Sequence, residues 1–142
     1  MKYAIDASVA LKWVLPEIDS DKGLRLRADF QAALHELLSP DIFSLEVSNS
    51  LARAERNGAI GPGVADIHLT NILSTSPQLH SYHPLLRRAL AIANAARHGV
   101  YDCLYVALAE SEGCELVTAD DKLVKRLQPK FPFIVPLSSL PS

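Results

Sequence analysis

Short apolar runs alternate with helical patterns along nearly the whole chain, and this alternation restricts the fold more than any other feature of the sequence. The apolar runs have the length of buried strands and fall at residues 2–5, 79–82, 115–118 and 133–135. Segments with apolar residues on one helical face separate them. Strands that alternate with helices form a parallel sheet, because each connection crosses a face of the sheet. We therefore expect an α/β fold whose mostly parallel sheet is covered on both faces.

The expected helices begin and end at recognisable start and stop residues. Ser8 is expected to cap the first helix, and Pro84 suits the first residue of a later one. Gly99 is expected to end the helix that begins at Pro84, and Gly113 the helix after it. The expected helical segments are residues 9–14, 41 or 44 to 56, 64–73, 84 to about 96, 102 to about 111 and 120–127.

The sequence leaves one boundary open. A helix that begins near residue 20 keeps apolar residues at near-helical spacing as far as Leu37, and Pro40 is its latest possible end. Residues 37–39 could instead form the second strand of the sheet. Both interpretations fit the pattern, so the start of this strand is not predicted.

Composition sets the size and class of the protein. The 142 residues are 49% hydrophobic and 21% charged, which is typical of a folded globular protein. We expect one domain spanning residues 1–142, because this length is that of one ordinary domain and no linker or repeat interrupts it. The net charge of −2 lacks the basic excess of a typical duplex-binding domain, so contacts with nucleic acid are expected to be local.

No segment has the character of a signal peptide or a membrane span. Asp6 interrupts the first apolar run too early for a signal-peptide core, and no run approaches the roughly 18 to 20 apolar residues that a bilayer requires. Cys103 and Cys114 match no zinc or redox spacing. We expect a soluble protein of the reducing cytoplasm, with no membrane partner.

Four acids occupy positions where a parallel sheet would bring them together. Asp6 and Asp120 each follow an expected strand, and Asp102 begins an expected helix, where the helix dipole favours a carboxylate. Glu46 lies in the first turns of its helix, on a polar face with Asn49. Ligands of open parallel sheets bind beyond the carboxyl ends of the strands, so these acids are expected to converge.

Each acid alone has an ordinary structural explanation, as a turn residue, a helix cap or a solvated side chain. Together they need a partner, because two carboxylates about 4 Å apart repel by roughly 4 kcal/mol at an effective dielectric constant of 20. Oxygen ligands without histidine or thiolate select Mg²⁺ or Mn²⁺ over zinc. Such an ion can activate water for attack on a phosphodiester. The four acids therefore favour metal-dependent phosphodiester hydrolysis.

Four motifs in order resemble one family. IDAS, with Asp6, SLEVSNSLARA, with Glu46, YDCLYVALAE, with Asp102, and LVTADDKL, with Asp120, look like the motifs of the PIN-domain nucleases. The size and spacing resemble the VapC-type toxins of bacterial and archaeal toxin–antitoxin pairs. The resemblance covers nearly the whole chain.

The resemblance implies a Rossmann-like three-layer α/β/α sandwich and endoribonuclease activity. It implies that Asp6, Glu46, Asp102 and Asp120 hold Mg²⁺ or Mn²⁺. It also implies a homodimer held by helices and a cognate VapB-type antitoxin whose C-terminal peptide fills the groove. Ser8 and Thr118 match hydroxyls of the family that would orient carboxylates or water. Asp121 falls at a variable position of the family pattern, so it is expected either to contact the metal-binding acids without touching the metal or to be exposed to solvent.

Other polar residues give weaker signals. Arg53, Arg56, Lys12 and Lys122 lie near the acids in sequence and are candidate contacts for RNA phosphates, although sparse charges usually serve solubility. Arg53 is the best of them, because it lies two helical turns beyond Glu46. The five histidines show no established ligand spacing apart from a close pair at residues 80 and 83.

Two other functions compete with the nuclease. The same scaffold could serve as a catalytically silent binding or regulatory module. It could also be a different acid-pocket enzyme or a phosphoacceptor domain, but Asp6-Ala-Ser lacks the second aspartate of an Asp-x-Asp motif and the adjacent acid pair of receiver domains. Binding of Mn²⁺ would separate the nuclease from the silent module.

Overall fold

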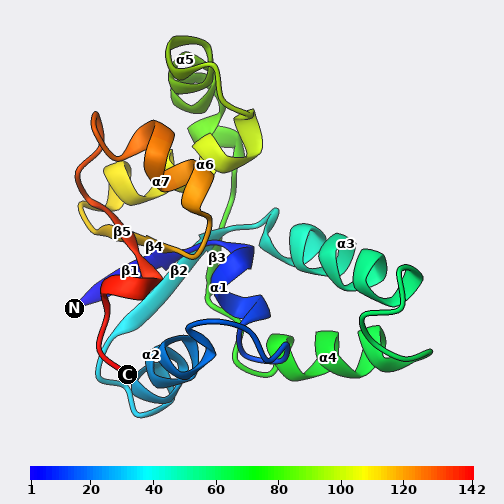
Figure 1. The fold of residues 1–142 in the computed structure, drawn as a ribbon. Coiled ribbons are helices and arrows are strands. Elements are labelled where there is room, and N and C mark those ends of the chain that lie inside the picture. The colour runs from blue at the N-terminus through cyan, green and yellow to red at the C-terminus, as the bar shows by residue number, and fades with distance from the viewer.

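The computed structural model describes every residue from Met1 to Ser142 and contains one five-stranded sheet (Figure 1). The strands are β1 (Lys2–Ile5), β2 (Glu36–Pro40), β3 (Gln78–His80), β4 (Glu115–Thr118) and β5 (Ile134–Pro136). They lie in the order β3-β2-β1-β4-β5, and all four neighbouring pairs are parallel. The expected α/β fold with a parallel sheet is confirmed.

Seven helices surround the sheet. They are α1 (Ala7–Leu11), α2 (Ser20–Gln31), α3 (Phe43–Arg56), α4 (Val64–Leu73), α5 (Leu86–Ala96), α6 (Val100–Glu112) and α7 (Asp121–Leu127), with short 3₁₀ turns at His83–Leu85 and Leu137–Ser139. Helices α5, α6 and α7 lie on one side of the sheet, and α1 and α2 lie on the other (Figure 1). Helices α3 and α4 form a pair that extends away from the sheet on the second side. The molecule is a three-layer sandwich.

Alternation along the strands divides the core into two layers. Ala4 and Leu38 belong to the cluster beneath α5, α6 and α7, whereas their neighbours Ile5 and Leu37 belong to the cluster with α1 to α4. These strands are apolar on both faces because helices cover both. Side chains of successive strand residues point to opposite faces, so a shift of one residue would exchange the two layers.

The structure settles the open boundary in favour of the strand. Helix α2 ends at Gln31, and Ala33 takes a left-handed conformation with φ of 59°, which turns the chain before Leu34. Leu34 is 67% exposed, so its place in the helical spacing is incidental. Leu37 pairs with Tyr3 of β1 and is fully buried. The apolar spacing of this segment therefore came from a strand that follows a helix.

Two expected helix starts were wrong by about two residues, and one expected stop residue was not the cap. Helix α1 begins at Ala7, so Ser8 lies inside its first turn and is not the N-cap. Helix α5 ends at Ala96, where Arg97 takes the left-handed cap position expected of a glycine. Gly99 is instead the N-cap of α6, which begins at Val100, so that Asp102 lies in the first turn. The expected cap at Gly113 is confirmed, with φ of 63°.

None of the helices combines the length and the apolar character needed to cross a membrane.

Gly23 is expected to be required where α2 packs on α1. A Cβ atom at this position would lie 3.0 Å from Cβ of Lys12, and the Gly23 carbonyl accepts a hydrogen bond of 3.0 Å from Nε1 of Trp13. Alanine favours helix by about 1 kcal/mol, but overpacking costs about 1–3 kcal/mol. Gly23→Ala should therefore lower the free energy of unfolding by about 1 kcal/mol in urea titrations.

The matched control is Ala28→Gly, at an exposed position of the same helix, which should lose about 1 kcal/mol through helix propensity alone. A Gly23→Ala protein more stable than the parent would show that α1 and α2 separate easily.

Candidate active site

The candidate site lies where the chain order of the sheet changes direction. From β1 the chain moves outward through β2 and β3, then returns to add β4 and β5 on the other side of β1. Asp6 directly follows β1, and Asp120 lies two residues beyond the end of β4. Crevices of open α/β sheets form at such a switch point, beyond the carboxyl ends of the strands. The fold itself therefore brings these two acids together.

One pocket of about 280 Å³ contains all four expected acids. Helix α3 follows β2 and brings Glu46 to the carboxyl edge of the sheet, and α6 runs back toward the amino edge from a first turn that contains Asp102. The lining residues are Asp6, Ala7, Ser8, Leu11, Glu46, Asn49, Ser50, Arg53, Asp102 and Asp120. Carboxylates from four separate segments thus share one pocket, and Arg53 is the one basic side chain among the lining residues.

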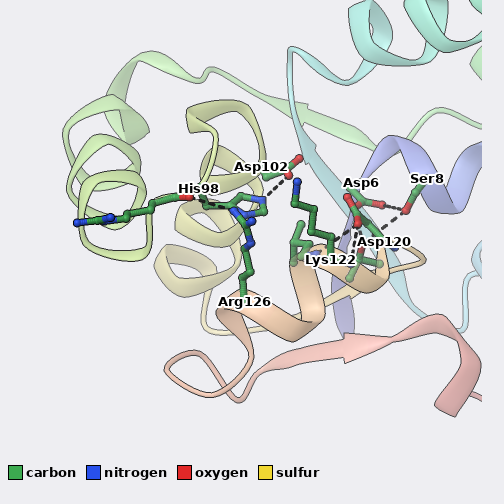
Figure 2. Close-up of polar contacts among 10 residues, drawn as sticks. Asp6, Ser8, His98, Asp102, Asp120, Lys122 and Arg126 are labelled. Atoms are coloured by element: carbon green, nitrogen blue, oxygen red, sulfur yellow. Dashed lines mark hydrogen bonds and ion pairs between the residues drawn. The ribbon is translucent and has the colours of Figure 1, made fainter.

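Two hydroxyl groups fix the Asp6 carboxylate (Figure 2). Ser8 Oγ donates to one carboxylate oxygen and Thr118 Oγ1 to the other, each at 2.5 Å. The Ser8 oxygen accepts from the backbone N–H of Ala119 at 2.9 Å, and the Thr118 oxygen accepts from that of Asp120 at 3.0 Å. Because each hydroxyl oxygen accepts from the backbone, its own proton is left to point at Asp6.

Asp120 caps a helix and faces the pocket as well. Its Oδ1 accepts from the backbone N–H groups of Lys122 and Leu123 at 3.0 and 3.3 Å, as expected of the N-cap of α7. The ordinary capping role and the place in the pocket are therefore both present in one residue.

His98 contacts Asp102 directly. Its Nε2 lies 2.6 Å from Oδ2 of Asp102, and the His98 side chain is only 5% exposed (Figure 2). The other ring nitrogen, Nδ1, is buried without a partner. The sequence interpretation considered the histidines only as zinc ligands and missed this contact. The four-residue spacing between His98 and Asp102 at a helix start was the available signal.

Glu46 lies beside a buried tyrosine. Burial raises the pKa of Glu46, the Tyr105 hydroxyl opposes that shift, and the charge of Asp102 adds to it. The Tyr105 hydroxyl itself is buried and makes no hydrogen bond of ordinary geometry. Tyr105 packs in the core. It also turns its hydroxyl toward Glu46, and a buried hydrogen-bond donor is satisfied best by a carboxylate or a water.

Asp6 is the most perturbed acid of the pocket. It is 5% exposed, and burial raises its pKa to about 7. The hydrogen bonds from Ser8 and Thr118 lower the pKa, while the charges of Asp102 and Asp120 raise it further. A carboxyl group with this pKa in a pocket is a common sign of a functional site.

The structure separates the four basic candidates. Arg53 lines the acidic pocket. Lys122 is exposed in the first turn of α7 and points toward the side of Asp102 in Figure 2. Lys12 instead lies 3.9 Å from Glu17 and lines a different hollow together with Asp121. Arg56 is exposed at the end of α3, outside the pocket.

The donor set suits a hard divalent cation, although the side chains are not drawn tightly together. No three acidic, histidine or cysteine side chains form a compact group that could hold an ion as they stand. Mg²⁺ keeps several waters and needs only one or two direct carboxylates, so a looser arrangement of oxygens can suffice. The raised pKa of Asp6 also fits, because a nearby cation would favour its ionised form. Asp6, Asp102, Asp120 and Glu46 are the residues that could hold it.

A larger hollow lies at the opposite edge of the sheet but lacks such a set. It has a volume of about 570 Å³ and is lined in part by Tyr3, Phe133 and Cys114. Of its charged residues, Lys2 is paired with Glu112, and Glu110 with Arg88, which leaves Glu115 as a single unpaired acid. The smaller, acidic pocket is therefore the candidate active site.

The chain belongs to the PIN-domain family, since the model of the PIN domain matches residues 3–127. The ribonuclease VapC3 of Pyrobaculum aerophilum is 34% identical over 139 residues, which cover 95% of this chain and 98% of that protein. The ribonuclease VapC3 of Mycobacterium tuberculosis is 30% identical over 124 residues, or 87% of this chain and 86% of that protein. The resemblance to VapC-type PIN proteins is thus confirmed.

Two solved structures share the fold. The crystal structure of PAE2754 from Pyrobaculum aerophilum matches with a TM-score of 0.70 and 25% identity, over 98% of this chain and 94% of that one. VapBC2 from Rickettsia felis, bound to a DNA fragment from its promoter, matches with a TM-score of 0.61 and 15% identity, over 96% and 97%. The second likeness concerns the fold alone.

The burial of Asp6 predicts a pH-dependent stability of the metal-free protein. Its pKa is about 7 when folded and near 3.8 as a free side chain, so the stability that Asp6 contributes is fully present below about pH 3.8. That contribution declines as the pH rises and is lost above about pH 7. Asp6→Asn should leave stability similar at pH 4 and raise it by up to about 4 kcal/mol at pH 8 in EDTA.

Urea unfolding of both proteins between pH 4 and 8 measures this difference. Exposed Asp121→Asn serves as the control and should show no comparable pH-dependent gain. A constant difference between Asp6→Asn and the parent protein would contradict the burial of a titrating carboxyl group.

Proposed function

We propose that the protein is a Mg²⁺- or Mn²⁺-dependent endoribonuclease and the toxin of a VapBC-type toxin–antitoxin pair. The observation that supports this most is the single pocket in which acids from four segments meet at the switch point of the sheet. The relatives named ribonuclease VapC3 support RNA as the substrate. Phosphodiester hydrolysis is the chemistry that such an acid set serves when it holds a divalent ion.

A divalent cation in the pocket would supply Lewis acidity, orienting water and offsetting the charge that grows on the phosphodiester oxygens. The residues of the chain do the rest. Ser8 and Thr118 hold the Asp6 carboxylate in one orientation. Glu46, whose pKa is raised by burial, is suited to accept the proton that water loses as its oxygen bonds to phosphorus and the bond from phosphorus to the leaving oxygen of the RNA breaks, that oxygen being protonated from solvent. Arg53 lies in the same pocket and can contact a phosphate.

The surface beside the pocket supports an antitoxin partner. A hollow of about 310 Å³ is lined by Ile42, Leu45 and Tyr101, and it shares Glu46 and Asn49 with the acidic pocket. Leu45 is 72% exposed and Tyr101 is 66% exposed. An apolar peptide from a VapB-type antitoxin would bury both side chains and lie against the acids. We also propose that helices join two copies of the chain in a homodimer, and that the pair acts in the cytoplasm.

One observation favours a second candidate function. The acids do not form a compact group, which is also what a catalytically silent PIN-like binding module would show. Such a module would retain the fold and the apolar hollow but would neither bind Mn²⁺ nor cut RNA.

Cleavage of RNA should depend on Asp120 but not on its neighbour Asp121. Asp120 faces the acidic pocket, whereas exposed Asp121 lines a separate hollow. Asp6→Asn and Asp120→Asn should each reduce cleavage of total cellular RNA with Mg²⁺ or Mn²⁺ by roughly 100-fold or more, because each removes a charge that holds the cation. Asparagine is as good an N-cap as aspartate, so Asp120→Asn should remain folded.

Asp121→Asn is the matched control and should cleave like the parent protein, while EDTA should stop cleavage by all of them. Full cleavage by Asp6→Asn, or equal loss in Asp120→Asn and Asp121→Asn, would refute the proposed site.

Mn²⁺ should bind to the protein in the absence of RNA and should stabilise it. A ligand at 100 times its dissociation constant adds about 2.7 kcal/mol to the free energy of unfolding. Asp102→Asn should weaken Mn²⁺ binding in calorimetric titrations at pH 8, because it removes one of the four acids of the pocket. Unchanged Mn²⁺ binding in this variant, or none by the parent protein, would favour the silent module.

A further inference from the structure

Asp102 differs from Asp6 and Asp120 in how its carboxylate is held. Two hydroxyls hold Asp6, and backbone N–H groups at the start of α7 hold Asp120. Asp102 lies in the first turn of α6, where a carboxylate can bond the free N–H groups of the helix end. Its one hydrogen bond comes instead from the side chain of His98, whose Nε2 lies 2.6 Å from Oδ2 (Figure 2). This leaves Oδ1 without a partner.

The ring of His98 is buried for the sake of this one contact. A carboxylate oxygen only accepts, so Nε2 carries the hydrogen and Nδ1 is left as an acceptor. Nδ1 is buried and contacts no donor, and the side chain as a whole is 5% exposed. A buried polar atom without a partner is unfavourable. The ring therefore keeps an unfavourable position that brings its other nitrogen to Asp102.

The backbone around His98 is fixed as well. Its N–H donates to the Ala93 carbonyl at 3.1 Å, and Arg97 turns the chain at the end of α5 with a left-handed φ of 54°. Nη1 of Arg126 donates to the Arg97 carbonyl at 3.1 Å, which ties this segment to α7. Asp120 is the N-cap of α7. The histidine and two of the acids are thus held on connected segments.

Stabilisation of helix α6 does not account for the contact. The dipole at the start of a helix favours a negative charge and opposes a positive one, so Asp102 suits its position without any histidine. What His98 adds is a fixed orientation of the carboxylate. Carboxylates that bind metal ions are usually held in this way by a hydrogen bond from outside the ligand set.

We propose that His98 is a positioning residue, whose Nε2–H holds Oδ2 of Asp102 and leaves Oδ1 free to bind a divalent cation in the acidic pocket. The proposal rests on the proposed metal-dependent function, from which it takes the cation. His98 itself touches neither the cation nor the RNA. Substitution of His98 should therefore act on metal binding through Asp102 alone, and another group that donates from the position of Nε2 should replace the imidazole.

The test compares the affinity for Mn²⁺ among variants of His98, by calorimetric titration in the absence of RNA. His98→Leu removes the donor and keeps an apolar side chain in the buried position, so it should weaken Mn²⁺ binding about 10-fold or more. The amide nitrogen of glutamine can take the place of Nε2, so His98→Gln should restore most of the affinity. His98→Asn carries its amide nearer to the backbone, in the place of Nδ1, and should bind as weakly as His98→Leu.

Two further variants serve as controls. His83 is exposed in the turn that precedes α5, at the other end of that helix, so His83→Leu should bind Mn²⁺ like the parent protein. In an Asp102→Asn background, His98→Leu should cause no further loss of affinity, because the carboxylate that His98 positions is already gone. Should His98→Leu fail to fold, the comparison of His98→Gln with His98→Asn gives the same readout.

Unchanged affinity in His98→Leu or His98→Asn would overturn the positioning role, as would an equal loss in His98→Gln and His98→Asn. Lower stability of these variants in urea with unchanged Mn²⁺ affinity would indicate a structural contact only. Further loss in the Asp102→Asn background would also overturn the role, because His98 would then contact the ion itself. Absence of Mn²⁺ binding by the parent, or binding independent of Asp102, would refute the proposed metal site and the positioning role with it. Asp102-dependent binding that is insensitive to His98 would refute only the positioning role.

Discussion

One buried carboxyl group at the end of the central strand sets the character of the pocket. Asp6 lies between the hydroxyls of Ser8, in the first turn of α1, and Thr118, at the end of β4, and those hydroxyls are themselves held by backbone N–H groups. Burial of a carboxylate is unfavourable unless donors or a cation compensate it. The sheet therefore keeps at its switch point a group that is poorly satisfied without a ligand. A positive charge in this pocket would relieve that deficit.

Stability and function oppose each other at several points around this group. The acidic charges of the pocket repel, Tyr105 buries a hydroxyl without a hydrogen bond, and Arg97 strains the end of α5. These features lie close to the site, while the layers of the core are filled by ordinary apolar side chains. Departures from the rules of stable folding are expected to gather where a protein acts.

Features that follow from apolar periodicity and from the order of elements along the chain could be predicted from the sequence. Contacts between particular side chains could not. Asp6 and Asp120 could be placed together because parallel strands end at one edge of the sheet. The start of β2 could not be predicted, since Leu34 and Leu37 keep helical spacing across a turn at Ala33. The contact between His98 and Asp102 was missed because the helix was expected to begin at Asp102. The left-handed cap of α5 at Arg97 was missed because a glycine, such as Gly99, is the stronger signal for the end of a helix.

The pairing of Asp6 with Thr118 also sets when the site can exist during synthesis. These residues are 112 positions apart, although β1 can pair with β2 once residue 40 has been made. Strand β4 and the cap of α7 are made long after β1 and β2, so a nascent chain that stops short of them has Asp6 without its full set of neighbours. The acidic pocket is therefore assembled late in synthesis, only once residues from distant parts of the chain have all been made.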